Sequence, residues 1–106
     1  MRQILIEKYI EPSEIKCFKH YIEGDITIKR WLDINYNLHS FMGQPAYIRY
    51  ENGKIEMQEW YKKGVRHRDK NLPSVISYKK GRVSTQSRYK NGEFLGSRWG
   101  TFYSEH

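Results

Sequence analysis

The sequence has little that would build a large apolar core or a covalent framework. Only 38% of its 106 residues are hydrophobic, and three are proline. The single cysteine, Cys17, excludes an internal disulfide framework and indicates a reducing compartment. The apolar run at residues 4–6 is too short for a signal peptide or a membrane span. We therefore expect one soluble, intracellular domain located in the cytoplasm.

Residue combinations that carry catalysis or bind metals are also missing. His67-Arg68-Asp69 looks like the catalytic loop of protein kinases, but no other kinase motif is present. The four histidines include no pair at metal-ligand spacing, and Cys17 alone indicates no nucleophile. We expect no enzymatic activity, no metal site and no cofactor. We expect His67 to pack between hairpins and Asp69 to pair with Arg66 or Arg68.

What the sequence does contain is an internal repeat. Residues 37–64 and 65–92 align without a gap and are identical at nine of 28 positions, against about two expected by chance. The identical pairs are His39/His67, Pro45/Pro73, Ile48/Ile76, Tyr50/Tyr78, Gly53/Gly81, Gln58/Gln86, Tyr61/Tyr89, Lys62/Lys90 and Gly64/Gly92. A fixed period of this length is typical of stacked units, and it favours a binding surface over an enzyme.

Turn residues predict that each unit is a β-hairpin. Asn52-Gly53 lies between two alternating runs and predicts a type I′ turn, and Lys80-Gly81 is its equivalent. Further turns are expected at Lys63-Gly64 and Asn91-Gly92. Nine tyrosines suit β-structure that is exposed on one face. The fold prediction is all-β, with hairpin repeats of about 28 residues stacked into an elongated, twisted antiparallel sheet.

Alternation along the longer strand predicts which side chains share a face. One face, taken as the core, carries Ile55, Met57 and Tyr61, with Val83, Thr85 and Tyr89 one repeat later. The other face, taken as solvated, carries Lys54, Glu56, Gln58 and Trp60, with Arg82, Ser84, Gln86 and Arg88 one repeat later. Trp60 and Arg88 then occupy equivalent positions, and a ring packing under a neighbouring guanidinium is expected there.

The remaining segments extend the array at both ends. Residues 14–36 are predicted to be a degenerate copy, offset by one extra residue near Asn35-Tyr36-Asn37. Residues 1–13 are predicted to supply an N-terminal edge strand. Residues 93–106 lack the repeat's histidine and proline and are predicted to form a C-terminal cap, with Trp99, Phe102 and Tyr103 as capping side chains.

The second unit resembles the MORN-repeat variants of bacterial antitoxin-like proteins (the YwqK group) and of large DNA viruses. The residues that carry the resemblance are Trp60-Tyr61, Gly64, His67-Arg68, Leu72-Pro73, Tyr78 and Gly81. The resemblance covers about residues 14–94. It implies stacked hairpins that serve as a scaffold or contact surface, as in an antitoxin-like inhibitor or a viral accessory protein acting in the host cytoplasm.

Positive charge is concentrated in the repeats. Residues 49–90 carry twelve Lys or Arg and four Asp or Glu, a net charge of +8, whereas residues 1–48 carry six of each. This asymmetry bears on partners rather than on fold. The candidate partner-binding residues are Trp60, Lys62, Lys63, Arg66, Arg68, Lys79, Lys80, Arg82, Arg88 and Lys90.

Three interpretations of these residues stay open. The basic groups can serve solubility alone, since lysines at hairpin tips also oppose edge-to-edge aggregation. They can bind an acidic protein partner, with aromatic and arginine anchors. As the alternative function, they can bind nucleic acid or anionic lipid through the basic face of residues 49–90. Self-association through the ends of the sheet is a further expectation.

Overall fold

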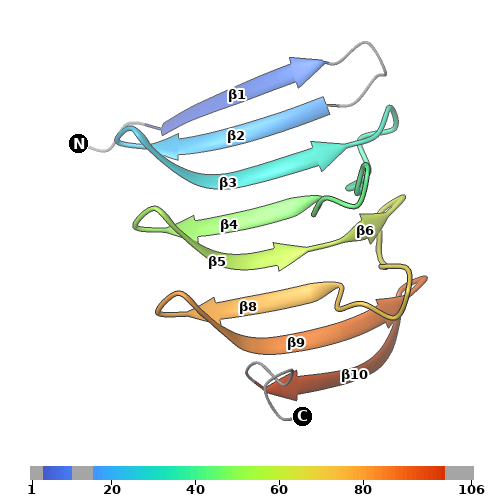
Figure 1. Cartoon of the computed structure of the whole chain (residues 1–106). Helices are drawn as coiled ribbons and strands as arrows, with labels where there is room; N and C mark the ends of the chain where they lie inside the picture. The colour runs from blue at the N-terminus through green and yellow to red at the C-terminus, as the bar shows by residue number, and fades with distance from the viewer. Residues whose placement is uncertain (1–3, 11–15, 100–106) are drawn as a thin grey trace.

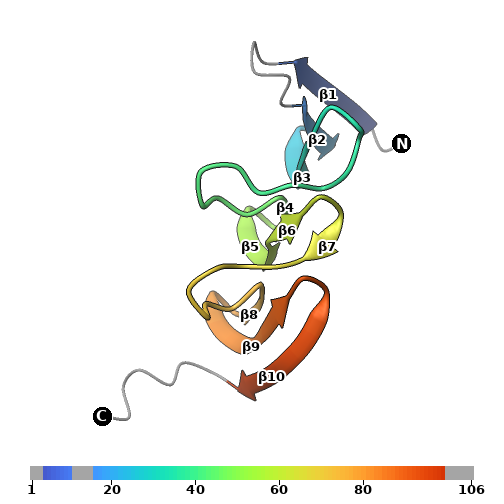
Figure 2. The ribbon, with the colours of Figure 1, turned by 90° about the vertical axis from the view of Figure 1, so that its right-hand side faces the viewer.

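The chain folds into antiparallel β-structure, in a computed structural model that describes residues 4–10 and 16–99. Eight strands form one sheet in the order β1-β2-β3-β4-β5-β8-β9-β10 (Figure 1), and β6 pairs with β7 separately (Figure 2). The strands are β1 (Ile4–Ile10), β2 (Lys16–Ile22), β3 (Asp25–Leu32), β4 (Tyr47–Glu51), β5 (Lys54–Glu59), β6 (Tyr61–Lys62), β7 (Val65–Arg66), β8 (Val75–Lys79), β9 (Arg82–Lys90) and β10 (Glu93–Trp99). The predicted all-β antiparallel class is confirmed.

The main sheet is a single elongated layer, and the described chain as a whole measures 45 × 32 × 18 Å. β1 forms one edge, within the segment predicted to be an edge strand. β10 forms the other edge, so residues 93–99 make a further strand where the sequence predicted a cap. Phe102 and Tyr103 lie outside the described residues. Within the part of the chain that is described, no helix is long and apolar enough to cross a membrane.

Left-handed two-residue turns join β2 to β3, β4 to β5 and β8 to β9. Asn52 and Gly53 have φ of 52° and 79°, which is the predicted type I′ geometry, and Lys80 and Gly81 have φ of 54° and 78°. Glu23 and Gly24 form the corresponding turn between β2 and β3. These three turns lie at the same end of the strands, along a side of the sheet that we call the hairpin edge and that is distinct from the edge strands β1 and β10 (Figure 1).

A β-bulge follows each of these turns and reverses the alternation of side chains. Tyr50 pairs with Ile55 but Arg49 pairs with Met57, so one extra residue, Glu56, sits between them. Since Arg49 and Tyr50 are adjacent and point to opposite faces, Ile55 and Met57 do so too. The same register shift occurs between Ser77 and Tyr78 and between His20 and Tyr21.

The bulge explains why the predicted faces were wrong. Gln58 pairs with Ile48 on one side and Ile76 on the other, so these three side chains share a face. Trp60, predicted to be solvated, is only 5% exposed, and Gln86, likewise predicted to be solvated, is buried. A prediction from strict alternation does not include an inserted residue, and it therefore assigned the side chains that follow Glu56 to the wrong face of the sheet.

The most buried residues lie at the end of the sheet opposite the hairpin edge. Ala46 and Ser74 are fully buried where the chain enters β4 and β8, beside the buried Glu59, Trp60 and His67. Two connections, residues 39–45 and 67–73, fold over the sheet at this end (Figure 2). We call them the first and second connection, and this end of the sheet the connection edge. Because the sheet has one layer, these connections provide much of its cover.

The turn between β8 and β9 gives a test of the local geometry. Lys80 adopts φ of 54°, a left-handed conformation that asparagine tolerates better than lysine. We expect Lys80→Asn to raise the free energy of unfolding by about 0.5–1 kcal/mol, measured by urea denaturation. The matched control, Lys79→Asn, replaces an adjacent strand residue that is not among those with positive φ. An equal gain from both variants would contradict the explanation.

Candidate functional site

The candidate partner-binding residues form two groups on opposite edges of the sheet. Lys79, Lys80 and Arg82 flank the β8–β9 turn on the hairpin edge. The others lie toward the connection edge, on or beside β6, β7, the second connection and the end of β9 (Figure 1). They are Trp60, Lys62, Lys63, Arg66, Arg68, Arg88 and Lys90. The candidate cations are therefore divided between the two edges. A hollow of about 570 Å³ on the hairpin edge is lined by Lys54, Lys79 and Lys80 with Tyr78, but also by the carboxylates of Glu51 and Glu56. The hollow at the connection edge has three cations and one carboxylate, so it has the larger excess of positive charge.

Two histidines, at equivalent positions of the two units, hold the connections to the neighbouring turns. The His39 N–H donates to the carbonyl of Trp31 at 3.1 Å, and its Nδ1 accepts the N–H of Lys63 at 3.0 Å. The His67 N–H donates to the carbonyl of Trp60 at 3.1 Å, and its Nδ1 accepts the N–H of Asn91 at 2.9 Å. Each ring therefore satisfies a backbone donor in the turn that ends its own unit.

His67 also fixes the second connection from within. Since Nδ1 is an acceptor, the ring proton lies on Nε2, which donates to Asp69 Oδ1 at 2.8 Å. This bond and the adjacent imidazole lower the pKa of Asp69. His67 is buried between hairpins as predicted, but the predicted partner of Asp69 was wrong. Asp69 pairs instead with the buried His67 ring, which lies two residues earlier in the same connection.

Trp60 joins the two connections. Its indole Nε1–H donates to the carbonyl of Gly43 in the first connection at 3.0 Å. Its ring lies under the guanidinium of Arg68 in the second connection, 3.8 Å from ring centroid to Cζ. Arg68 in turn donates to the carbonyl of Pro73 at 3.0 Å. The expected ring–guanidinium packing exists, but its cation is Arg68, because Arg88 donates to Asn71 Oδ1 at 2.9 Å.

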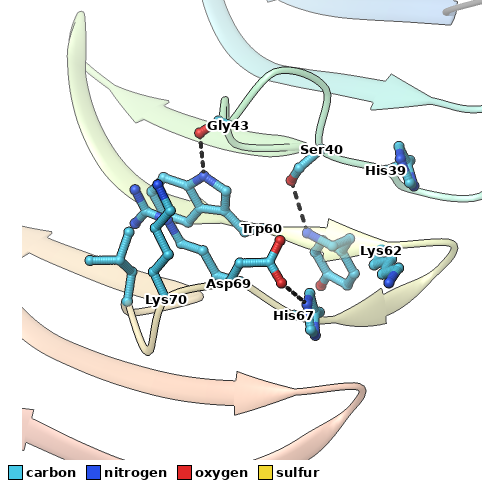
Figure 3. A pocket seen from close by; sticks show the side chains of 11 residues that line it. His39, Ser40, Gly43, Trp60, Lys62, His67, Asp69 and Lys70 are labelled. Carbon is cyan, nitrogen blue, oxygen red and sulfur yellow. Dashed lines mark hydrogen bonds and ion pairs between the residues drawn. The ribbon is translucent and has the colours of Figure 1, made fainter.

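A hollow of about 370 Å³ lies between the two connections (Figure 3). His39, Ser40 and Gly43 line it from the first connection, and His67, Arg68, Asp69, Lys70 and Leu72 line it from the second; Trp60, Tyr61 and Lys62 complete it. Its charged groups are three cations and one carboxylate, Asp69, which His67 already holds. The hollow is therefore electropositive and contains apolar and aromatic surface, a combination suited to an anionic group on a larger ligand.

A second hollow of about 340 Å³ lies on the far side of the second connection. Arg88 and Lys90 line it together with Arg68 and Lys70, so cations face both sides of this loop. The bond from Arg88 to Asn71 holds the loop from this side, as Trp60 and Arg68 hold it from the other. Lys70 was not among the predicted site residues, although its alignment with Met42 marked it as a position where the copies differ.

Arg66 is occupied in the fold. The Tyr61 hydroxyl donates to Glu59 Oε1, and the Arg66 guanidinium lies 3.7 Å from the same oxygen. Arg66 also lies over the ring of Tyr89, 5.2 Å from the centroid. Burial and the bond to Glu59 raise the pKa of Tyr61 to about 12. This cluster closes the β6–β7 hairpin against the main sheet, which assigns Arg66 a structural role.

The two units satisfy one backbone group by different means. The N–H of Tyr61 donates to Ser40 Oγ at 3.0 Å, and the equivalent N–H of Tyr89 donates to Ser74 Oγ at 2.7 Å. Ser40 aligns with Arg68, whereas Ser74 aligns with Ala46. In the second unit the acceptor hydroxyl comes from residue 74. Residue 68 is therefore not needed as an acceptor and can be an arginine. The exchange explains how the repeat accommodates Arg68 without losing a buried hydrogen bond.

The serine exchange makes a testable prediction. Ser74→Ala leaves the N–H of Tyr89 without its acceptor and should lower the free energy of unfolding by about 1–2 kcal/mol. In the background of Arg68→Ser, a hydroxyl returns to the position that Ser40 occupies in the first unit, and the same change should cost much less. Denaturant titrations of the four proteins in this cycle measure the coupling. Additive effects would contradict the proposed equivalence.

The Tyr61 cluster makes stability depend on high pH. Since folding raises the pKa of Tyr61 from 10.0 to about 12, its contribution is fully present below pH 10 and is lost as the pH rises through 12. The wild type should therefore lose more stability than Tyr61→Phe between pH 9 and pH 12, measured by urea denaturation at each pH. Parallel losses in the two proteins would show that Tyr61 is not the group responsible.

The connection edge has no described metal cluster and no counterpart in the comparisons. Within residues 4–10 and 16–99, no three His, Cys, Asp or Glu side chains come together as candidate metal ligands. Comparison of the chain with protein-family models, with curated proteins and with solved structures found no match.

Proposed function

We propose that the protein is a non-enzymatic binding scaffold whose connection edge takes up an acidic segment of a partner protein. The observation that carries this proposal is Arg68, set over the buried Trp60 ring and tied to the carbonyl of Pro73. A guanidinium fixed in this way loses little side-chain freedom when it meets a carboxylate. Arginine and tryptophan are also the residues enriched at the energetic centres of protein interfaces.

The surroundings of Arg68 support an anionic partner. Lys62 and Lys70 face the same hollow, and Arg88 and Lys90 lie across the second connection. A partner carboxylate there would meet cations from several elements, of which Arg68 and Arg88 are already held by hydrogen bonds, and this favours both encounter and specificity. Trp60 itself, being buried, acts as the support for Arg68 rather than as a contact residue.

The resemblance to MORN-repeat variants is compatible with this role, and it motivates a more specific proposal. Stacked hairpins that present a contact edge suit an antitoxin-like inhibitor or a viral accessory protein, each of which acts by binding one protein. The imidazoles of His39 and His67 each hold a turn, and this supports a scaffold role for groups that would otherwise suggest catalysis.

Nucleic acid or anionic lipid is the alternative partner. The division of the cations between two edges supports it less well, because a phosphate backbone or a lipid surface is matched by a continuous basic face. Binding to duplex DNA through about five phosphates would have a log–log salt slope near −4 to −5.

The test is affinity capture from the native host with three baits, the wild type and two charge-reversed variants. We expect the wild type and Lys80→Glu to retain a stoichiometric protein with an acidic segment, and Arg68→Glu to lose it, because of the two substituted residues Arg68 lies at the connection edge and Lys80 does not. Lys80→Glu is the matched control, since it makes the same charge change at the hairpin edge. Equal loss from both variants would contradict the proposed edge, and so would strong, salt-dependent binding to duplex DNA or acidic vesicles with no protein retained.

A further inference from the structure

The two connections have the same backbone turn at their tips. In the first, the N–H of Gln44 donates to the carbonyl of Phe41 at 3.0 Å; in the second, that of Leu72 donates to Asp69 at 3.3 Å. The central residues are left-handed in both: Met42 and Gly43 have φ of 56° and 78°, and Lys70 and Asn71 have φ of 63° and 57°. Met42 and Lys70 therefore leave their connections in corresponding directions, one repeat apart.

The two tips have the same backbone conformation but different side chains. Met42 is 95% exposed, although a left-handed turn favours glycine or asparagine and water disfavours an apolar side chain. Lys70 is exposed at the equivalent position, beside Arg68 and its hollow. Nothing in the fold requires methionine at position 42, and departures from local preference of this kind are typical of functional positions.

The distance between the tips is set by the sheet. The first connection leads into β4 and the second into β8, and β5 lies between these strands. Two interstrand spacings separate the connections by about 10 Å. Trp60 contacts both connections, through the carbonyl of Gly43 and the guanidinium of Arg68, so their separation is built into the free protein.

Several backbone N–H groups at the connection edge already have acceptors within the protein, which disfavours pairing with an added strand. The N–H groups of Gln44 and Leu72 close their own turns, and those of Gly64 and Gly92 donate to Leu38 and Arg66. A segment that crosses the edge should therefore bind through its side chains. A polyproline II segment needs no backbone partner, and it presents residues i and i+3 on one face about 9 Å apart, close to the separation of the tips.

We infer that the partner segment crosses both connections in an extended, polyproline II-like form, with an apolar side chain on Met42 and a carboxylate three residues away beside Lys70 and Arg68. This inference rests on the proposed function and specifies what the acidic segment must contain. The apolar residue supplies buried area at the first tip, and the carboxylate supplies charge at the second. Spacing, rather than net charge, then determines which acidic segment binds.

Two isomeric peptides of equal charge test the spacing. One contains Leu-Pro-Pro-Glu and the other Leu-Glu-Pro-Pro, each flanked by the same glycines. Binding is followed by the NMR shifts of the Trp60 indole N–H and the Gly43 amide, which lie at the hollow. We expect the first peptide to bind about five- to tenfold more tightly, the gain from seating one apolar side chain.

Variants separate the two tips. Met42→Ser should remove the preference between the isomers, and Lys70→Asn should weaken both peptides. Lys80→Asn is the matched control, because Lys80 is also a left-handed lysine in a tight turn, but on the hairpin edge. It should leave both affinities unchanged.

The outcomes distinguish this inference from the proposed function. Equal affinities for the isomers, an unchanged preference in Met42→Ser, or no shift at millimolar peptide would overturn the inference. If a captured acidic partner is nevertheless lost with Arg68→Glu, the proposed function stands without it. If Arg68→Glu retains every partner that the wild type retains, the proposed function fails whatever the peptides show.

Discussion

Two imidazole rings accept hydrogen bonds from the turns that end their own units, and much of the connection edge depends on these bonds. Nδ1 of His39 accepts from Lys63, and Nδ1 of His67 accepts from Asn91. A one-layer sheet has no second layer to cover the ends of its strands, so backbone donors there need partners from the connections. The histidines supply them, and in doing so they set each connection against the sheet at a defined place.

Once the connections are held, Trp60 can bridge them. Its ring is buried between two loops that are far apart in sequence, with an indole bond to one and a cation over its face from the other. A side chain that looks like a surface anchor in the sequence is thus part of the scaffold. The anchor is the arginine above it, whose position is decided by the ring, by Pro73 and by the loop that Arg88 holds from the far side.

The residues that differ between the two units distinguish the positions that support the fold from those that form the contact surface. Ser40 and Ser74 perform the same task from different positions, so the second unit can place Arg68 where the first needs a hydroxyl. Ser40 and Arg68 are not among the identical pairs of the alignment, and the sequence predicted the basic residues around Arg68 as candidates. It did not show that Arg66 is occupied by Glu59 and Tyr89, nor that Lys70 faces the hollow, because both depend on contacts between separate hairpins.

The sequence by itself determined the all-β antiparallel class and the turn at Asn52-Gly53, because glycine turns and alternating runs are local signals. Tertiary structure decided which face is buried. One inserted residue at Glu56 reverses the pleat, and the connections then cover the side that carries Trp60. It also decided how the cations divide between two edges. Strand pairing and loop packing are cooperative and nonlocal, so neither the faces nor the hollow could be obtained from the period of the repeat.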